Sequence, residues 1–398
     1  MSPAERDDEA RLRPETRVVH SGRRPAAGES LAPPLVQASV QVFDSLDDYD
    51  DVAAGRRPGH LYGRNSNENV ASLEAAVADL EGAGAAVATA SGMAAILCTV
   101  LALASTPRPL VVDRDAYGVS LALLRSDLEP LGYEIREVDL ADEGALKAAL
   151  PGAGLVICET VTNPLARVND LQRICALATA EGIAVVVDNT YATPLLCRPL
   201  AWGATAVVHS VSKYLAGHSD LIAGVVCAEP RLIEAVRQRV IRTGGSLGPF
   251  EAWLAMRGLR TLALRVHRQS ANALRLAEGL RKLPQVERVW HPSIPGARDH
   301  GLSARQLPDG SGGMFAFDLA GGRPAVQAML DRLRLVRFAA SFGGVETTIS
   351  YPALASHRNL STAEQLNRGI GPGTVRVSAG IEAADDLLTD FRQALAGA

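Results

Sequence analysis

The sequence predicts an α/β protein in which a mainly parallel sheet, covered by helices on both faces, precedes a smaller α+β domain. Between residues 61 and 258, short apolar runs alternate with segments of helical periodicity, as in parallel sheets with crossover helices. Beyond residue 258 this alternation ends. The length of 398 residues exceeds one ordinary core. We therefore expect an N-terminal arm over 1–60, a large domain over 61–258 and a small domain over 259–398.

The arm is rich in Arg, Pro and Gly and shows little periodicity, so we expect no separate domain there. The large domain is expected to open with a helix that Gly82 ends, and a second helix begins at Gly92. Four apolar residues at helical spacing predict the first helix: Leu73, Ala76, Val77 and Leu80. The expected strands are short and rich in β-branched residues; they cover 85–89, 110–113, 134–139, 155–159, 183–188, 206–210 and 223–227.

The small domain is predicted to begin with a long amphipathic helix over 266–282. Its other expected elements are strands at 286–290 and 314–319, a helix at 325–333, a strand at 375–378 and a final helix.

Composition excludes several classes of function. A net charge of −4 without a concentrated basic face argues against nucleic-acid partners. No apolar run reaches membrane-spanning length, and the polar, arginine-rich N-terminus does not resemble a signal peptide. The five cysteines lack Cys-x-x-Cys spacing and the histidines show no ligand spacing, so we expect no metal and a cytoplasmic location with reduced thiols.

Lys213 and Asp188 are the leading site candidates. Lys213 comes three residues after the apolar run 206–210. Ser210, which ends this run, and Ser212 are two residues apart, so their hydroxyls share one face of an extended chain. Hydroxyls and a cation suit a phosphate, and a partly desolvated lysine can form a Schiff base. Asp188 ends another apolar strand. Taken singly, Lys213 would more often be a solvated lysine, and Asp188 would more often be a helix cap or a turn residue. Together they favour a pyridoxal phosphate (PLP) site.

Residues before the helix at Gly92 could bind the cofactor phosphate. Ser91, Gly92 and Met93 join a strand to this helix, and free N–H groups at a helix N-terminus bind phosphate. The alternative is an ordinary capping serine. Tyr117 follows the strand at 110–113 and could stack on an aromatic cofactor or belong to the core.

Arg376 and Arg64 lie in different surroundings and so have different expected roles. Arg376 lies within a short apolar strand, and a buried arginine requires an anion. A substrate α-carboxylate or a structural aspartate would serve equally. Tyr62 and Arg64 lie at the end of the arm, where an arginine is usually solvated.

From about residue 17 to the end, the chain resembles the Cys/Met-metabolism family of PLP enzymes, which includes cystathionine γ-synthase, cystathionine γ-lyase, cystathionine β-lyase, methionine γ-lyase and O-acetylhomoserine sulfhydrylase. The matching motifs are Tyr62-x-Arg64, Leu80-Glu81-Gly82, Ser91-Gly92-Met93-Ala94-Ala95, Tyr117-Gly118, Glu159-Thr160-x-Thr162-Asn163-Pro164, Val187-Asp188-Asn189-Thr190, Ser210-x-Ser212-Lys213-Tyr214-x-x-Gly217-His218-x-Asp220, Arg257-Gly258-Leu259, Ser341-x-Gly343-Gly344 and Arg376-x-Ser378-x-Gly380.

The resemblance implies a fold-type I PLP-dependent transferase-like structure with a seven-stranded sheet. It implies that Lys213 is the Schiff-base lysine and proton shuttle, that Asp188 is the partner of the pyridine nitrogen, and that Tyr117 is the tyrosine stacked on the ring.

It also implies the contacts around the ring. The phosphate would be held by Gly92, Met93, Ser210 and Ser212, and, from a neighbouring subunit, by Tyr62 and Arg64. This sharing implies a homotetramer built as a dimer of dimers. The cofactor oxygen and the substrate carboxylate would be held by Asn163, Ser341 and Arg376.

Four departures from the family pattern stand out. Asn67-Glu68-Asn69 replaces Asn-Pro-Thr, and Ser212 replaces the commoner threonine while keeping the hydroxyl. Val119 stands where methionine γ-lyases have cysteine and cystathionine enzymes usually have glycine. Ala340 stands where cystathionine γ-synthases and γ-lyases have glutamate and methionine γ-lyases have an apolar residue.

We therefore expect PLP-dependent γ-elimination of an amino-acid substrate, namely methionine, homocysteine or cystathionine, that releases 2-oxobutanoate, ammonia and a thiol. One alternative is a γ-replacement enzyme of the cystathionine γ-synthase or O-acetylhomoserine sulfhydrylase type. Another is a PLP-binding protein without turnover, but the complete set of Tyr62, Tyr117, Asp188, Lys213 and Arg376 argues against it.

Overall fold

The large domain contains the predicted mainly parallel sheet. The computed structural model describes residues 12–22 and 25–396, so residues 1–11, 23 and 24 of the expected arm and residues 397 and 398 lie outside the described part. The seven strands run in the order β1-β7-β6-β5-β4-β2-β3. Their bounds are β1 Ala85–Thr89, β2 Leu110–Asp113, β3 Ile135–Val138, β4 Leu155–Glu159, β5 Ala184–Asp188, β6 Ala206–Ser210 and β7 Gly224–Ala228.

The direction of β7 shapes the edge where the site lies. Neighbouring strands from β3 through β6 are parallel, whereas β7 is antiparallel to both β6 and β1. The segment 211–223 contains no helix that could carry the chain back across the sheet, so β7 returns directly beside β6. The carboxyl ends of β1, β2, β4, β5 and β6 therefore meet at one edge, together with the 211–223 loop.

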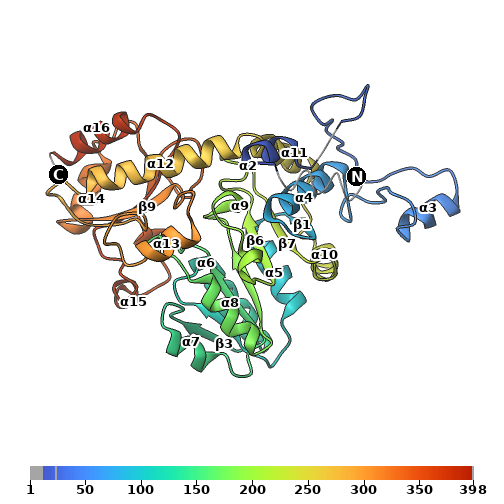
Figure 1. Cartoon of the computed structure of the whole chain (residues 1–398), viewed down its shortest axis with the longest axis horizontal. Helices are drawn as coiled ribbons and strands as arrows, with labels where there is room; N and C mark the ends of the chain where they lie inside the picture. Colours follow the sequence, from blue (N-terminus) through green and yellow to red (C-terminus); the bar gives the residue numbers. More distant parts are fainter. Residues whose placement is uncertain (1–11, 23–24, 397–398) are drawn as a thin grey trace.

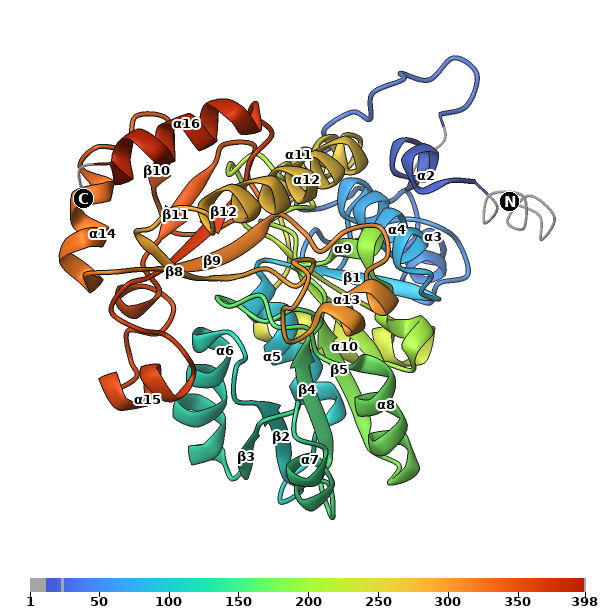
Figure 2. The ribbon, with the colours of Figure 1, turned by 60° about the vertical axis from the view of Figure 1, so that its left-hand side comes forward.

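Helices cover both faces of this sheet (Figures 1 and 2). Val185 and Val187 of β5 pack into one core cluster, and Val186 packs into the other, because successive side chains of a strand point to opposite faces. The first cluster includes α4 (Glu68–Glu81), α8 (Leu171–Ala180) and α11 (Pro249–Leu259); the second includes α5 (Gly92–Leu103), α6 (Gly118–Ala122) and α10 (Pro230–Thr243). Two short helices complete the domain, α7 (Glu143–Ala149) and α9 (Thr193–Leu196).

The arm is tied to the start of α4 by two side-chain amides. The Asn67 side chain caps α4 at Asn69 N and donates to the Val36 carbonyl. Asn69 accepts from Val36 N and donates to the Pro34 carbonyl, at 2.9 Å and 2.8 Å. Asn67 matches the first residue of the family's Asn-Pro-Thr motif, whereas Asn69 stands in place of its threonine. The departure at residue 69 therefore supplies a second amide that holds the arm against the large domain.

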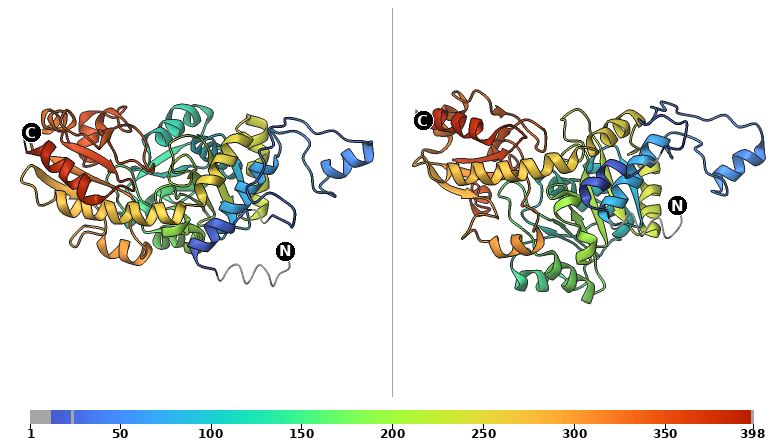
Figure 3. Two further views of the ribbon diagram at one scale, coloured as in Figure 1. Left: turned by 90° about the horizontal axis from the view of Figure 1, so that it is seen from above. Right: turned by 45° about the horizontal axis from the view of Figure 1, so that its top comes forward.

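Two helices interrupt the arm, α2 (Pro14–His20) and α3 (Leu46–Ala53). The Arg17 side chain is buried and pairs with Asp79 of α4 at 2.9 Å. The segment that carries α3 projects from the body in the views of Figures 1 and 3. Val42 is 94% exposed and Leu46 is 88% exposed on this segment.

The small domain holds a five-stranded sheet in the order β10-β11-β12-β9-β8. Its strands are β8 Val286–Trp290, β9 Met314–Leu319, β10 Arg337–Phe338, β11 Thr348–Ser350 and β12 Thr374–Ser378, and its helices are α12 Leu262–Leu280, α13 His300–Gln306, α14 Gly322–Leu330, α15 Thr362–Asn367 and α16 Ala384–Leu395. The predicted α12 and α14 start four and three residues earlier than expected. In α14, Pro324 falls in the first turn, where a helix tolerates proline.

Within residues 12–22 and 25–396, no helix is long and apolar enough to cross a membrane. The same residues contain no group of three His, Cys, Asp or Glu side chains that could hold a metal ion.

Candidate active site

The candidate site lies where the carboxyl ends of the large-sheet strands face the small domain. Glu159 ends β4 and Asp188 ends β5, and the two residues are direct partners in the parallel ladder. Ser210 ends β6, next to the loop that carries Lys213. Because paired residues on neighbouring strands project to the same face, Glu159 and Asp188 place two carboxyl groups side by side.

Lys213 reaches from the large domain to the small domain. Its Nζ donates to Ser341 Oγ at 2.6 Å and lies 5.2 Å from the centre of the Phe342 ring. Burial, with a smaller effect from the nearby Arg376 charge, lowers the pKa of Lys213 to about 8. A larger fraction of this amine is therefore neutral near pH 7 than for an ordinary lysine. The neutral amine is the form that attacks a carbonyl carbon.

Asp188 forms no ion pair with a lysine or arginine in the described part of the chain. Its Oδ1 accepts the Thr190 backbone N–H at 2.9 Å. Burial raises the pKa of Asp188, while the hydrogen bonds from Thr190 and the nearby His209 lower it. A protonated ring nitrogen at this position would supply the missing positive charge.

A cradle for an anion forms at the N-terminus of α5. Ser91 caps the helix by accepting from Ala94 N, which leaves the N–H groups of Gly92 and Met93 without intrahelical partners. A Cβ at Gly92 would lie 2.9 Å from Ser210 Cβ, so only glycine allows the helix end to approach β6 this closely. The Ser212 hydroxyl accepts from Ala223 N at 2.9 Å and donates to the Ala223 carbonyl at 3.2 Å. The predicted role of Ser212 in the phosphate cup therefore stays a prediction.

Arg376 on β12 is a buried guanidinium without a carboxylate partner among the described residues. Its Nη1 donates to Asn163 Oδ1 at 3.0 Å, its Nη2 donates to the Ser341 carbonyl, and its Nε has no partner. Burial lowers the pKa of Arg376 to about 10. Of the two partners expected for Arg376, the structural aspartate is thus not found among the described residues. The arrangement suits a carboxylate ligand between Arg376, Asn163 and Ser341.

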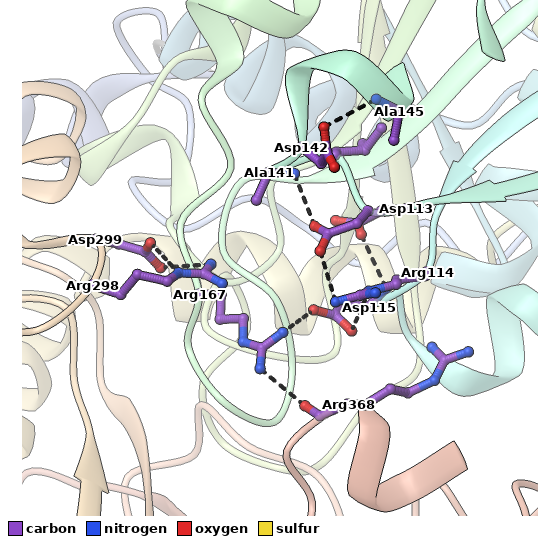
Figure 4. Close-up of polar contacts among 12 residues, drawn as sticks. Asp113, Arg114, Asp115, Ala141, Asp142, Ala145, Arg167, Arg298, Asp299 and Arg368 are labelled. Carbon is purple, nitrogen blue, oxygen red and sulfur yellow. Dashed lines mark hydrogen bonds and ion pairs between the residues drawn. The ribbon is translucent and has the colours of Figure 1, made fainter. Parts of the chain in front are cut away.

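Tyr117 is positioned from the backbone. Its N–H donates to Glu159 Oε1 at 2.6 Å. Burial raises the pKa of the Tyr117 phenol, and Arg376 opposes this effect. The preceding turn is held by Arg167, which donates to Asp115 Oδ2 at 2.6 Å and to the Arg368 carbonyl of the small domain at 3.0 Å (Figure 4). The Tyr117 segment therefore has anchors in both domains.

Tyr62 and Arg64 do not join this group within one chain. Arg64 donates to the Ile241 carbonyl of α10 at 2.9 Å, and its guanidinium lies 5.4 Å from the centre of the Tyr62 ring. Neither contact involves Lys213, Asp188 or Arg376. Ala340, next to Ser341, is exposed, and Val119 is 45% exposed.

Sequence reasoning assigned no role to Glu159 or Phe342. The sequence places Glu159 at the end of an expected strand and in a family motif without a role of its own, yet it accepts a hydrogen bond from the Tyr117 backbone. Phe342 lies within 5.5 Å of the Arg376 guanidinium and near Lys213. Its place directly after Ser341 was the available signal. Direct pairing of Glu159 with Asp188 could have been expected from their equal positions at the ends of two strands.

These residues fit PLP. The N-terminus of α5 with Ser210 offers donors for a phosphate, Asp188 offers a carboxylate for a ring nitrogen, and Lys213 offers an amine of lowered pKa. Arg376 remains for a second anion.

Comparisons with known proteins agree. The profile of the Cys/Met metabolism PLP-dependent enzyme family matches residues 15–396. The chain is 40% identical over 384 residues to L-methionine gamma-lyase of Pseudomonas putida, with 96% of each chain covered. It is 37% identical to O-succinylhomoserine sulfhydrylase of Pseudomonas aeruginosa, covering 96% of this chain and 95% of that protein. A Campylobacter jejuni structure described as an O-acetylhomoserine (thiol)-lyase carries N'-pyridoxyl-lysine-5'-monophosphate; it has a TM-score of 0.91 and 28% identity, covering 97% of this chain and 100% of that one.

Proposed function

The chain belongs to the Cys/Met metabolism family of PLP-dependent enzymes, and we propose that it catalyses γ-elimination of a sulfur amino acid with an uncharged side chain. Methionine or homocysteine would give 2-oxobutanoate, ammonia and a thiol. The convergence of Lys213, Asn163, Ser341 and Arg376 on one point between the two domains supports an amino-acid site. Ala340, directly before Ser341, supports the uncharged side chain.

The residues support distinct tasks in this reaction. Arg376, with Asn163, would bind the substrate carboxylate and so fix the Cα–H bond near Lys213. PLP, when bound, supplies a conjugated ring that accepts electrons from the substrate Cα. Lys213, already of lowered pKa, would accept and return the proton. Tyr117 would donate a proton to the departing sulfur.

Two further residues would surround the cofactor. Asp188, at the end of β5, would keep the ring nitrogen protonated. Gly92, Met93 and Ser210 would hold the phosphate, with Ser212 fixing the loop through the Ala223 backbone.

A γ-replacement reaction is the second candidate, supported by the similarity to the sulfhydrylase of Pseudomonas aeruginosa. The two reactions are separated by incubating the enzyme with methionine, homocysteine, cystathionine and O-acylhomoserines while assaying keto acid and thiol. The proposal expects keto acid from methionine or homocysteine without any added thiol. A protein active only on O-acylhomoserines with an added thiol is instead a replacement enzyme.

Substitution of Ala340 tests the choice of substrate. Ala340→Glu adds a carboxylate that can pair with the distal ammonium of cystathionine but is left unpaired beside the methyl group of methionine. We expect the ratio of kcat/KM for cystathionine to that for methionine to rise roughly ten- to a thousandfold. Ala320→Glu, on an exposed residue of the small domain, is the control. Equal ratios in the variant and the wild type would show that residue 340 does not contact the side chain.

We also propose that Tyr62 and Arg64 complete the phosphate site of a neighbouring subunit within a homotetramer. Val40, Val42 and Leu46 are exposed apolar residues close together on the projecting arm, and such groups of exposed apolar residues mark interaction surfaces, which supports an assembly. The five cysteines are free and buried, which suits the cytoplasmic location we propose.

Mixing two impaired variants tests this sharing. Arg64→Ala should weaken PLP retention, and Lys213→Ala should abolish turnover. A hybrid dimer would contain one intact site, made of Lys213 from one subunit and Arg64 from the other, so the mixture should regain activity. Arg57→Ala, on an exposed arginine of the arm, should behave like the wild type. No recovery after confirmed subunit exchange would place Arg64 outside the neighbour's site.

A further inference from the structure

Glu159 is a buried carboxyl group that the proposed reaction does not use. It is 8% exposed and lies beside Asp188, its direct partner in the β4–β5 ladder. Its Oε1 accepts the Tyr117 backbone N–H at 2.6 Å. No lysine or arginine forms an ion pair with Glu159 in the described part of the chain. The carboxyl group of Glu159 therefore contacts backbone N–H groups, those of Tyr117 and Asn163, rather than a charge partner.

The small domain also packs closely against the segment that contains Tyr117. A Cβ at Gly118 would collide with the Ser356 carbonyl, so the small domain approaches the segment closely there. Arg167 joins Asp115, two residues before Tyr117, to the Arg368 carbonyl (Figure 4). Glu159 is thus the contact that fixes the segment from the sheet side. It joins the backbone of Tyr117 to the strand next to the one that carries Asp188.

We propose that Glu159 is a positioning residue that sets the height of the Tyr117 ring over the Asp188 end of the sheet by accepting the Tyr117 N–H. This inference rests on the proposed ring site at Asp188 and Tyr117. It deepens that proposal, because the ring would lie between a carboxylate on β5 and a tyrosine held by the neighbouring β4.

The neighbouring Asp188 affects whether Glu159 is charged, and so whether its charge or its acceptor oxygen holds the Tyr117 N–H. Two adjacent carboxyl groups do not both ionise readily, and the ring nitrogen requires the charge on Asp188. Burial, and then the Asp188 charge, raise the pKa of Glu159 well above its ordinary value. A neutral carboxyl group still accepts an N–H through its carbonyl oxygen. A glutamine should therefore replace Glu159, whereas a residue without an acceptor should not.

The test compares Glu159→Gln with Glu159→Met, which has similar length but no oxygen. Two readouts are independent of turnover: the dissociation constant for PLP, and the circular dichroism of the visible cofactor band, which reports the asymmetric surroundings of the ring. Glu134→Gln, on an exposed carboxylate, is the control. We expect Glu159→Gln to keep both values within about twofold. Glu159→Met should lose most of the dichroism and bind PLP roughly 5- to 20-fold more weakly, as for one lost hydrogen bond.

Several outcomes would overturn the proposal. Unchanged dichroism and affinity in Glu159→Met would show that Glu159 does not position Tyr117. An equal loss in Glu159→Gln would show that charge, and not the acceptor, is required. If the methionine variant does not fold, the glutamine variant still decides, since its dichroism should keep the wild-type pH profile and a shifted profile contradicts a neutral Glu159. A wild-type protein without a visible cofactor band would instead overturn the proposed function.

Discussion

Replacement of Lys213 by alanine is expected to remove the visible absorbance of the bound cofactor and essentially all turnover. The Nζ of Lys213 is the amine of lowered pKa at the junction of the domains, hydrogen-bonded to Ser341. Alanine removes both the attachment point and the group that moves the substrate proton. A positioned acid–base group alone contributes roughly a hundred- to ten-thousandfold. The loss in kcat should therefore be at least of that size.

The measurement is an absorbance spectrum with added PLP, followed by a keto acid assay. Lys147→Ala serves as the control, because Lys147 lies on the exposed surface of α7 in an ion pair with Glu143. Both variants should fold alike, since neither residue belongs to the hydrophobic core. A Lys213→Ala protein that keeps the wild-type rate would remove Lys213 from the mechanism.

Asp188→Asn should bind PLP yet lose at least roughly two orders of magnitude in kcat. Asparagine has the shape of aspartate and can keep the hydrogen bond to the ring, but it lacks the charge that holds a proton on the nitrogen. Removing one well-placed electrostatic stabiliser costs other enzymes about a hundred- to a thousandfold. Thr190 and its neighbours should keep their positions, because the Thr190 N–H still finds an oxygen acceptor.

Parallel measurements of PLP affinity and kcat separate the two roles of Asp188. Asp309→Asn, on an exposed residue, controls for the change in net charge. An unchanged kcat would assign Asp188 to structure alone. A complete loss of PLP binding would show that the residue chiefly holds the cofactor in place.

The large sheet was predictable because its strands are apolar runs between glycine and polar residues. All seven predicted strands were confirmed, with ends shifted by a residue or so. β10 and β11 were not predicted, because they are two and three residues long and β10 is exposed. Strands this short depend on pairing with distant segments, which local sequence does not encode.

The site was predictable only in part. Lys213 and Asp188 could be chosen from local pattern, since each follows an apolar strand. The contact of Lys213 with Ser341 joins residues 128 positions apart, and the family resemblance implied only that Ser341 belongs to the site. The hydrogen bond from the Tyr117 backbone to Glu159 depends on the path of a loop, which neither the pattern nor the resemblance specified.

The product formed from methionine in deuterated water tests the central claim most directly. Loss of the thiol leaves Cγ as the future methyl carbon of 2-oxobutanoate, and that carbon must take one proton from the solvent. We predict 2-oxobutanoate with one deuterium in its methyl group, formed together with one equivalent of thiol and without an added thiol acceptor. Absence of 2-oxobutanoate from methionine and homocysteine, while an O-acylhomoserine and a thiol combine to a thioether, would contradict γ-elimination as the function of this protein.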